Sequence, residues 1–373
     1  MSERLLIEPD EQFVKEIAGQ GGEDVKLCSQ CATCSVSCKI TPYSHPFPRK
    51  EMIWMQWGMK DRLMADPDIW ACHQCNDCSV NCPRQAKPGD IFASIREYSF
   101  RHFATPSFFG KLASTPSMLP VFFLIPIVIL LGIFATFGNL GNFAGSGDAL
   151  TFNAVFPTVV VDATFIGVSF WLIFTILASL GKFWKQLRVE SRSNGHKGNL
   201  IGSAIATVME IITHKQFNGC DENSKRSLGH LMTFWGFLGL TATTGCVWIM
   251  TWFLGFETPL ELTNPVKILG NVSTVVVLIG LSILWAMRAS GDQKVGRSTY
   301  SDWLFISVLL TTIVTGFLSQ VTRLADIAVA ANSIYFIHLV MAFSLLFYLP
   351  YTKFAHMLYR LTAITYNKYV GRV

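Results

Sequence analysis

Six apolar stretches, each long enough to cross a lipid bilayer as a helix, dominate the chain after its first 116 residues. They fall near residues 117–138, 157–182, 228–254, 265–287, 303–323 and 332–356. A spanning helix needs about 20 mostly apolar residues, and each stretch is long enough. No apolar run in the first 100 residues reaches 18. The pattern therefore predicts a polar head followed by six membrane-spanning helices.

The charge of the connecting segments predicts how these helices are oriented. Eight Lys and Arg residues lie in 182–229, three in 288–300 and four after residue 352. The alternate connections, 139–156, 255–266 and 324–331, contain none. Because cytoplasmic loops carry the excess of Lys and Arg, we expect a multi-pass protein of the cytoplasmic (inner) membrane, with its head and C-terminus in the cytoplasm.

The composition of the head differs from that of the rest. Hydrophobic residues make up 51% of the chain, yet its first 100 residues hold eight of the ten cysteines. The opening sequence MSERLLIEPDEQF has no basic segment followed by an apolar core, so we expect no cleavable signal peptide. In a reducing compartment, closely spaced cysteines indicate metal or cluster ligands before disulfides.

The eight cysteines form two sets with the same spacing, C-x2-C-x2-C-x3-C. In two-cluster ferredoxins, three cysteines of such a run bind one cluster and the fourth binds the other. This pattern predicts one [4Fe-4S] cluster at Cys28, Cys31, Cys34 and Cys82, and a second at Cys72, Cys75, Cys78 and Cys38. Zinc is the main alternative, but it needs only two C-x2-C pairs and gives the third cysteine of each set no role.

Two histidines in the last apolar stretch, His338 and His356, suggest a second kind of cofactor. In one continuous helix, 18 residues make five turns, so both rings would leave one face about 27 Å apart. Neutral imidazole is an axial ligand of b-type haem, and histidine inside a bilayer indicates function. His230 opens the third stretch at the depth of His356, so this pair predicts one haem b. Gly236 and Gly239 are expected to leave room for its macrocycle.

A second haem b is less completely specified. No other histidine lies at the depth of His338, so it would need a non-histidine partner or an arrangement that brings His214 into the membrane. His214 could equally be a surface residue of a helix over 199–217 that lies along the membrane. Candidates for a menaquinone site are the interfacial groups Arg101, His102, Lys353 and Arg360, with lipid-headgroup anchoring as the alternative. We find no candidate catalytic residues, because nucleotide-binding loops and nucleophile–base arrangements are lacking.

These predictions define an α-helical fold with four parts. Residues 1–90 are expected to form a cytoplasmic, helical two-[4Fe-4S] ferredoxin-like domain, because the segment between the cysteine sets is long and amphipathic. Residues 91–116, which mix aromatic and basic residues, predict an interfacial linker. Residues 117–360 are expected to form a six-helix transmembrane cytochrome b bundle, and 361–373 a cytoplasmic tail.

The cysteine sets and the histidine pair followed by MLYR resemble known families. The head is similar to the C subunit of heterodisulfide reductase. Residues 157–360 are similar to its haem-b subunit and to the gamma subunit of respiratory nitrate reductase. The fusion of both resembles the membrane subunit of quinone-interacting membrane-bound oxidoreductase complexes (the QmoC family) of sulfate-reducing and related bacteria. In the nitrate-reductase pattern a second histidine follows the first by ten residues, where this chain has Leu240.

The resemblance implies electron transfer between menaquinone and a cytoplasmic partner. The implied partners are flavin and iron–sulfur subunits similar to heterodisulfide reductase A, which pass electrons to adenylylsulfate reductase. The membrane subunit of a heterodisulfide reductase or of a sulfite-reduction complex is an alternative with the same parts. A haem-free membrane anchor with structural clusters is an alternative of a different class.

Overall fold

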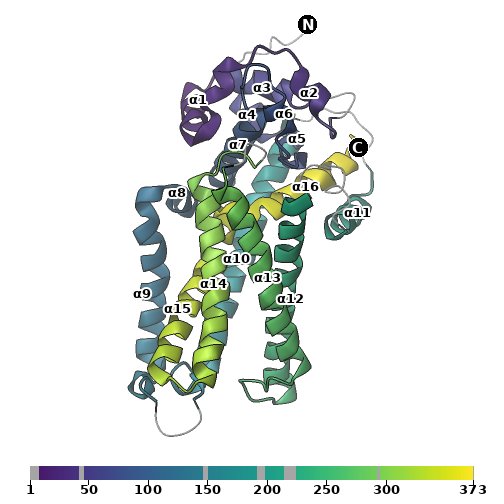
Figure 1. Cartoon of the computed structure of the whole chain (residues 1–373). Helices are drawn as coiled ribbons and strands as arrows, with labels where there is room; N and C mark the ends of the chain where they lie inside the picture. Colours follow the sequence, from purple (N-terminus) through teal and green to yellow (C-terminus); the bar gives the residue numbers. More distant parts are fainter. Residues whose placement is uncertain are drawn as a thin grey trace.

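The structure is a computed structural model that describes residues 8–41, 46–145, 150–190, 198–213, 224–291 and 295–372. Every regular element in these ranges is a helix, which confirms the predicted α-helical fold class. A head built mostly of short helices sits at one end of a bundle of long ones (Figure 1). We call the two ends of the bundle the head end and the far end.

The described part of the head contains helical turns at Ala18–Gly22 and Glu23–Leu27. Its α-helices are seven in number. They are α1 (Glu11–Ile17), α2 (Thr33–Ser37), α3 (Arg49–Gln56), α4 (Lys60–Met64), α5 (Asp68–Ala71), α6 (Asp77–Val80) and α7 (Pro88–Phe103). Helix α7 buries Ile91, Phe92 and Ile95 in the core of the head. The structure therefore differs from the expected interfacial linker over 91–116: residues up to Phe103 belong to the head, and only α8 (Ser107–Ser114) connects it to the bundle.

Six described helices are long and apolar enough to cross a membrane, as predicted. They are α9 (Leu119–Phe137), α10 (Thr158–Glu190), α12 (Ser224–Leu254), α13 (Pro265–Ala289), α14 (Tyr300–Leu324) and α15 (Ala328–Phe347). The length of each helix follows from its apolar run, which continues for at least four turns without a cluster of charged residues.

Helices α12 and α13 pack closely through small residues. A Cβ atom on Gly236 would lie 2.4 Å from Cγ2 of Val277 and 3.0 Å from the carbonyl oxygen of Ser273. A Cβ atom on Gly239 would lie 2.2 Å from Oγ of Ser273. The expectation that these glycines leave room for a macrocycle is therefore wrong: they let the two helix backbones approach, as small residues do in membrane bundles.

The last apolar stretch is not one helix. Helix α15 ends at Phe347, two short 3-10 turns follow at Leu349–Tyr351 and Lys353–Ala355, and α16 (His356–Tyr369) begins in a new direction. Pro350 lacks the N–H that a continuing helix needs. The expectation of one helix over 332–356, with His338 and His356 on one face, is therefore wrong.

Helix α16 lies crosswise between the head and the bundle (Figure 1). Helix α11 (Leu200–Ile212) packs along it, and Lys368 of α16 forms an ion pair with Glu210 of α11. The head end of α10 also enters the head, where Phe183 and Leu187 are fully buried. One apolar core thus joins α7, α10 and α16, and it connects the head to the bundle.

Candidate functional site

The two cysteine-bearing loops of the head have the same backbone shape. Gln30 and Gln74 are equivalent in the two sets, and both have a left-handed conformation, with φ of 61° and 53°. Ala32 and Asn76 are equivalent as well, with φ of 68° and 66°, and each is the residue before a short helix. Left-handed residues other than glycine are uncommon and cost energy, so their repetition indicates a shape that both loops need.

The structure brings the four cysteines of the first predicted group together and places cysteines of the second group near one another. Cys28, Cys31, Cys34 and Cys82 line one small pocket of the head. In the other group, Cys38 and Cys78 both lie close enough to Cys72 to interact with it electrostatically. Burial raises the pKa of the Cys34 thiol to about 11 and also raises the pKa of Cys38. Iron ligation would have to supply the charge that stabilises these buried thiolates.

N–H groups of both cysteine-bearing regions donate hydrogen bonds to cysteine sulfur atoms. The backbone N–H of Gln74 donates to Sγ of Cys72 and that of Ala86 to Sγ of Cys82, each over 3.3 Å. The side-chain amide of Gln30 donates to Sγ of Cys28 over 3.4 Å. Hydrogen bonds to cluster sulfurs are among the factors that set reduction potentials, so both groups have the surroundings of a redox cluster.

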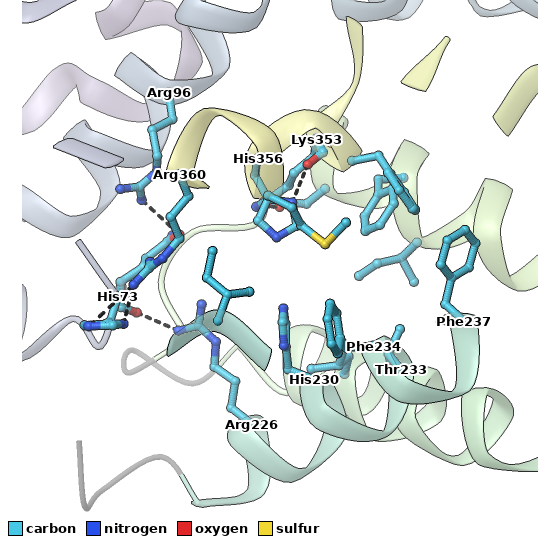
Figure 2. Close-up of a pocket in the computed structure, with 18 of the residues that line it drawn as sticks. His73, Arg96, Arg226, His230, Thr233, Phe234, Phe237, Lys353, His356 and Arg360 are labelled. Atoms are coloured by element: carbon cyan, nitrogen blue, oxygen red, sulfur yellow. Dashed lines mark hydrogen bonds and ion pairs between the residues drawn. The ribbon is translucent and has the colours of Figure 1, made fainter. Parts of the chain in front are cut away.

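His230 of α12 and His356 of α16 face each other across a cavity at the head end of the bundle (Figure 2). Their ring centres are 6.3 Å apart, and the ring planes meet at 77°. Two imidazoles that share one metal, with about 2.0–2.1 Å to each nitrogen and about 1.1 Å from nitrogen to ring centre, have centres about 6.3 Å apart. The observed separation therefore fits bis-histidine ligation of a haem iron.

The hydrogen bonding of His356 prepares its ring for this role. Nδ1 donates to the carbonyl oxygen of Lys353 over 2.7 Å, so Nε2 is the nitrogen with a free lone pair. Burial lowers the pKa of His356 to about 4, so the ring is neutral near pH 7. Lys353 is itself held by an ion pair with Asp302, which also pairs with Arg288 at 3.0 Å.

The cavity between the two histidines has an apolar end and a cationic end. It has a volume of about 290 Å³, and its walls come from the head, the bundle and α16. Its apolar lining includes Phe234, Phe237, Leu281, Phe305 and Leu309. Cys72 of the head lines it as well. Figure 2 shows four further lining residues at the same end: His73, Arg96, Arg226 and Arg360. A largely apolar molecule with an anionic edge fits this lining.

The loop of the second cysteine group forms the roof of this cavity. Arg360 donates to the carbonyl oxygen of Cys72 over 3.0 Å and to Nδ1 of His73 over 2.8 Å. Burial lowers the pKa of His73 to about 3, and the charges of Arg360 and Arg226 contribute to this shift, so the ring is neutral. A predicted cluster ligand and the histidine pair therefore line one cavity.

The other predicted site residues lie in different places. Lys353 and Arg360 line the cavity, but Arg101 forms an ion pair with Glu16 and His102 lies beside Gln186, at 3.4 Å, so the structure does not gather the four quinone candidates. At mid-bundle, His338 donates from Nδ1 to the carbonyl oxygen of Thr312 over 2.9 Å, and its ring lies against Gly316 of α14. His214 falls outside the described residues.

Three arginines and one acid of this site were missed by sequence reasoning. They are Arg96, Arg226, Arg288 and Asp302, all in the cavity wall. One signal was present for Arg226, since it precedes His230 by four residues, as Arg360 follows His356 by four. Such spacing places both side chains on one helix face. Asp302 gave no comparable signal, because its partners come from distant parts of the chain.

Comparisons with known proteins agree with this two-part architecture. Residues 20–87 match the 4Fe-4S dicluster domain family. The chain is 24% identical to the citrate utilization protein B of Escherichia coli, over 97% of this chain and 94% of that protein. It is 25% identical to the E subunit of the dihydromethanophenazine:CoB--CoM heterodisulfide reductase of Methanosarcina barkeri, over 69% of this chain and 94% of that protein.

The head alone has a closer relative. It is 36% identical to the C subunit of the H(2):CoB-CoM heterodisulfide,ferredoxin reductase of Methanothermobacter marburgensis, over 23% of this chain and 47% of that protein. No solved structure matches the chain. The fold and these relatives define a membrane electron-transfer protein of the oxidoreductase-subunit class, with an iron–sulfur head on a six-helix bundle.

Proposed function

We propose that this chain carries electrons between the menaquinone pool and a cytoplasmic redox partner, through haem b and two [4Fe-4S] clusters. The observation that supports this most strongly is the shared cavity: the 6.3 Å pair of His230 and His356 and the predicted cluster ligand Cys72 all line it. Haem and clusters, when bound, supply one-electron redox centres. The chain's own residues position those centres, orient the imidazoles and exclude water.

The cysteines are assigned to clusters as the spacing predicts. Cys28, Cys31, Cys34 and Cys82 would hold the first cluster, and Cys72, Cys75, Cys78 and Cys38 the second. The common pocket of the first set and the electrostatic proximity of Cys38 to Cys72 support this division. The second cluster would then be the one next to the haem, and the first would face the partner.

The cytoplasmic partner is proposed from resemblance. In a QmoC-like complex it would be a flavin and iron–sulfur protein similar to heterodisulfide reductase A, and the final acceptor or donor would be adenylylsulfate reductase. A second candidate is a role in citrate utilization, because the relative that matches 97% of this chain carries that name. Purification of the complex from its native membrane, followed by identification of the co-purifying proteins, separates the two.

The quinone site and a second haem are proposed with fewer residues than the sequence suggested. Lys353 and Arg360 line the cavity, so they are assigned to the inner haem's surroundings, and Arg101 and His102 remain the candidates near a quinone. His338 is the candidate ligand of a second haem, because its Nδ1–H bond leaves Nε2 as the basic nitrogen.

The experiment is a haem determination with reduced-minus-oxidised spectra on the purified full chain. We expect a b-type haem band that a menaquinol analogue reduces, and loss of the inner haem in His230→Ala and His356→Ala. His338→Ala is the matched control and should keep that haem. A preparation with intact iron and sulfide but no haem would refute the proposal and favour the haem-free anchor.

A further inference from the structure

We propose that Arg226 and Arg360 bind the two carboxylates of the haem and thereby turn its anionic edge toward the second cluster, with Arg96 as a positioning residue. This inference rests on the proposed haem function and adds an orientation to it. It assigns a carboxylate-binding subsite at the head end of the cavity.

The two arginines stand in equivalent positions relative to the two histidines. Arg226 lies one helical turn before His230 in α12, and Arg360 lies one turn after His356 in α16. Residues four apart share a helix face, so each arginine accompanies its histidine into the same cavity. Figure 2 shows both guanidinium groups at the His73 side of the pocket, away from Phe237.

Among the described residues of the cavity wall, cationic side chains outnumber acidic ones. The lining includes five cationic residues, Arg96, Arg226, Arg288, Lys353 and Arg360, and two carboxylates, Glu210 and Asp302. Asp302 pairs with both Arg288 and Lys353, and Glu210 with Lys368. Counted over the described residues, the wall carries more positive than negative charge, and positive charge in a low-dielectric site is costly unless an anion balances it.

Arg96 and Arg226 are held in place by neutral hydrogen-bond acceptors. Within the described residues, Arg96 donates to the carbonyl oxygen of Ile69 over 2.9 Å and to the side-chain oxygen of Gln74 over 3.1 Å. Arg226 donates to the backbone carbonyl of Gln74. Neutral acceptors fix the direction of a guanidinium group but keep its full charge, so these groups remain able to attract a carboxylate.

The chemistry of the ligand selects a haem over a quinone for this subsite. Haem b carries two carboxylates at one edge of an otherwise apolar ring, and the cavity has cations at one end and Phe234, Phe237 and Leu281 at the other. A quinone head group has no carboxylate. Arginine is the side chain best suited to bind carboxylates through paired hydrogen bonds. Arg360 would then contact the haem edge and the loop of Cys72 at once.

The test compares haem b with its dimethyl ester, in which both carboxylates are masked. The full-length chain is produced in cells unable to make haem, and their membranes are titrated with each compound while the b-type spectrum is followed. We expect the wild type to bind haem at least about tenfold more tightly than the diester, as charged hydrogen bonds require. Arg226→Gln and Arg360→Gln should each reduce this preference, and the double variant should abolish it.

Arg297→Gln is the matched control, because Arg297 pairs with Glu23 away from the cavity and should leave the preference unchanged. A second readout is the midpoint potential of the loaded haem: loss of either positive charge should lower it, and Arg360→Lys should largely restore it. If the wild type binds haem and diester equally, the subsite is refuted while the haem function stands. If it binds neither, the proposed function fails. The wild-type comparison needs no variant, so it decides even where a variant does not fold.

Discussion

Tyr359 of α16 should be the residue that contributes most to holding the head on the bundle. Its side chain is 1% exposed and stacks on Trp70 of the head, with ring centres 4.9 Å apart and planes at 17°. It also contacts Phe100 of α7 and Phe183 of α10, at 5.7 Å and 5.3 Å between ring centres. Tyr359→Ala removes a ring of α16 that touches the head and the bundle together.

The magnitude follows from the loss of a buried aromatic ring. Large aromatic residues replaced by alanine in a core cost about 3–5 kcal/mol, and each aromatic stack adds about 0.5–1.5 kcal/mol to what its burial alone provides. A loss of about 3 kcal/mol raises the fraction of undocked heads about 100-fold. Tyr359→Phe is the matched control: the hydroxyl has no hydrogen-bond partner among the described residues, so its removal should leave docking unchanged or slightly stronger.

The assay is limited proteolysis of the purified full chain in detergent, with release of the head followed over time. When opening is fast relative to cleavage, the cleavage rate reports the open population. We expect about 100-fold faster release for Tyr359→Ala and a change of less than about twofold for Tyr359→Phe. Equal release from wild type and Tyr359→Ala would refute the assignment. Equally fast release of the head from both variants would assign the effect to the hydroxyl instead of the ring.

Three further predictions concern the bundle and the head. Gly236→Ala should lower the free energy of unfolding by about 1–3 kcal/mol, the cost typical of overpacking, because its Cβ would clash with Val277. The melting temperature of the chain should fall accordingly. Gly316→Ala should displace the ring of His338, since the new Cβ would lie 2.9 Å from Cε1, and should alter any spectrum that depends on that ring. Glu51→Gln should raise the melting temperature at neutral and alkaline pH but not in acid. Burial and the charge of Asp66 raise the pKa of Glu51 above 4.5, so its contribution to stability is full below pH 4.5 and is lost as the pH rises through the folded-state pKa.

The first of these predictions has a matched control, and all three have an outcome that would contradict them. Gly245 lies in the same helix as Gly236 and has nothing within 4 Å of its Cβ position, so Gly245→Ala should be neutral or stabilising. If both glycine variants behave alike, the close α12–α13 contact is disproved. An unchanged spectrum of Gly316→Ala would mean that His338 adjusts freely. A melting-temperature gain in Glu51→Gln that is equal at all pH values would contradict the raised pKa.

The features that the sequence predicted correctly depend on local patterns. The six spans follow from the lengths of apolar runs. The assignment of the cysteines to two clusters stays a prediction, and it follows from spacing that a short loop must obey. The closeness of His230 and His356 followed from equal depth, which the orientation of the spans fixes. These are one-dimensional properties, so no knowledge of the tertiary packing was needed.

The predictions were wrong where the role of a residue depends on which residue packs against it. A glycine in a membrane helix indicates that another group packs closely against the helix backbone. The sequence around the glycine does not tell whether that group is a second helix or a macrocycle. Gly236 and Gly239 meet Val277 and Ser273, which lie in the next helix of the bundle. The role of Asp302 likewise depends on distant residues, because it forms ion pairs with Arg288 and Lys353 from two other elements. Pro350 cannot continue the hydrogen bonding of a helix, but the complete end of α15 depends on the packing of α16 under the head.

That break changes what the spacing of the two histidines means. In a continuous helix His356 would have ended a membrane span, whereas here it begins α16, which belongs equally to the bundle and the head. Within five residues, α16 then presents His356 to the cavity, Tyr359 to the core of the head and Arg360 to the Cys72 loop. Positions 356 and 360 share a face, and 359 lies beside them. One short helix therefore fixes the distance between the proposed haem and the second cluster, so a shift of α16 should change the electron-transfer rate and the docking of the head together.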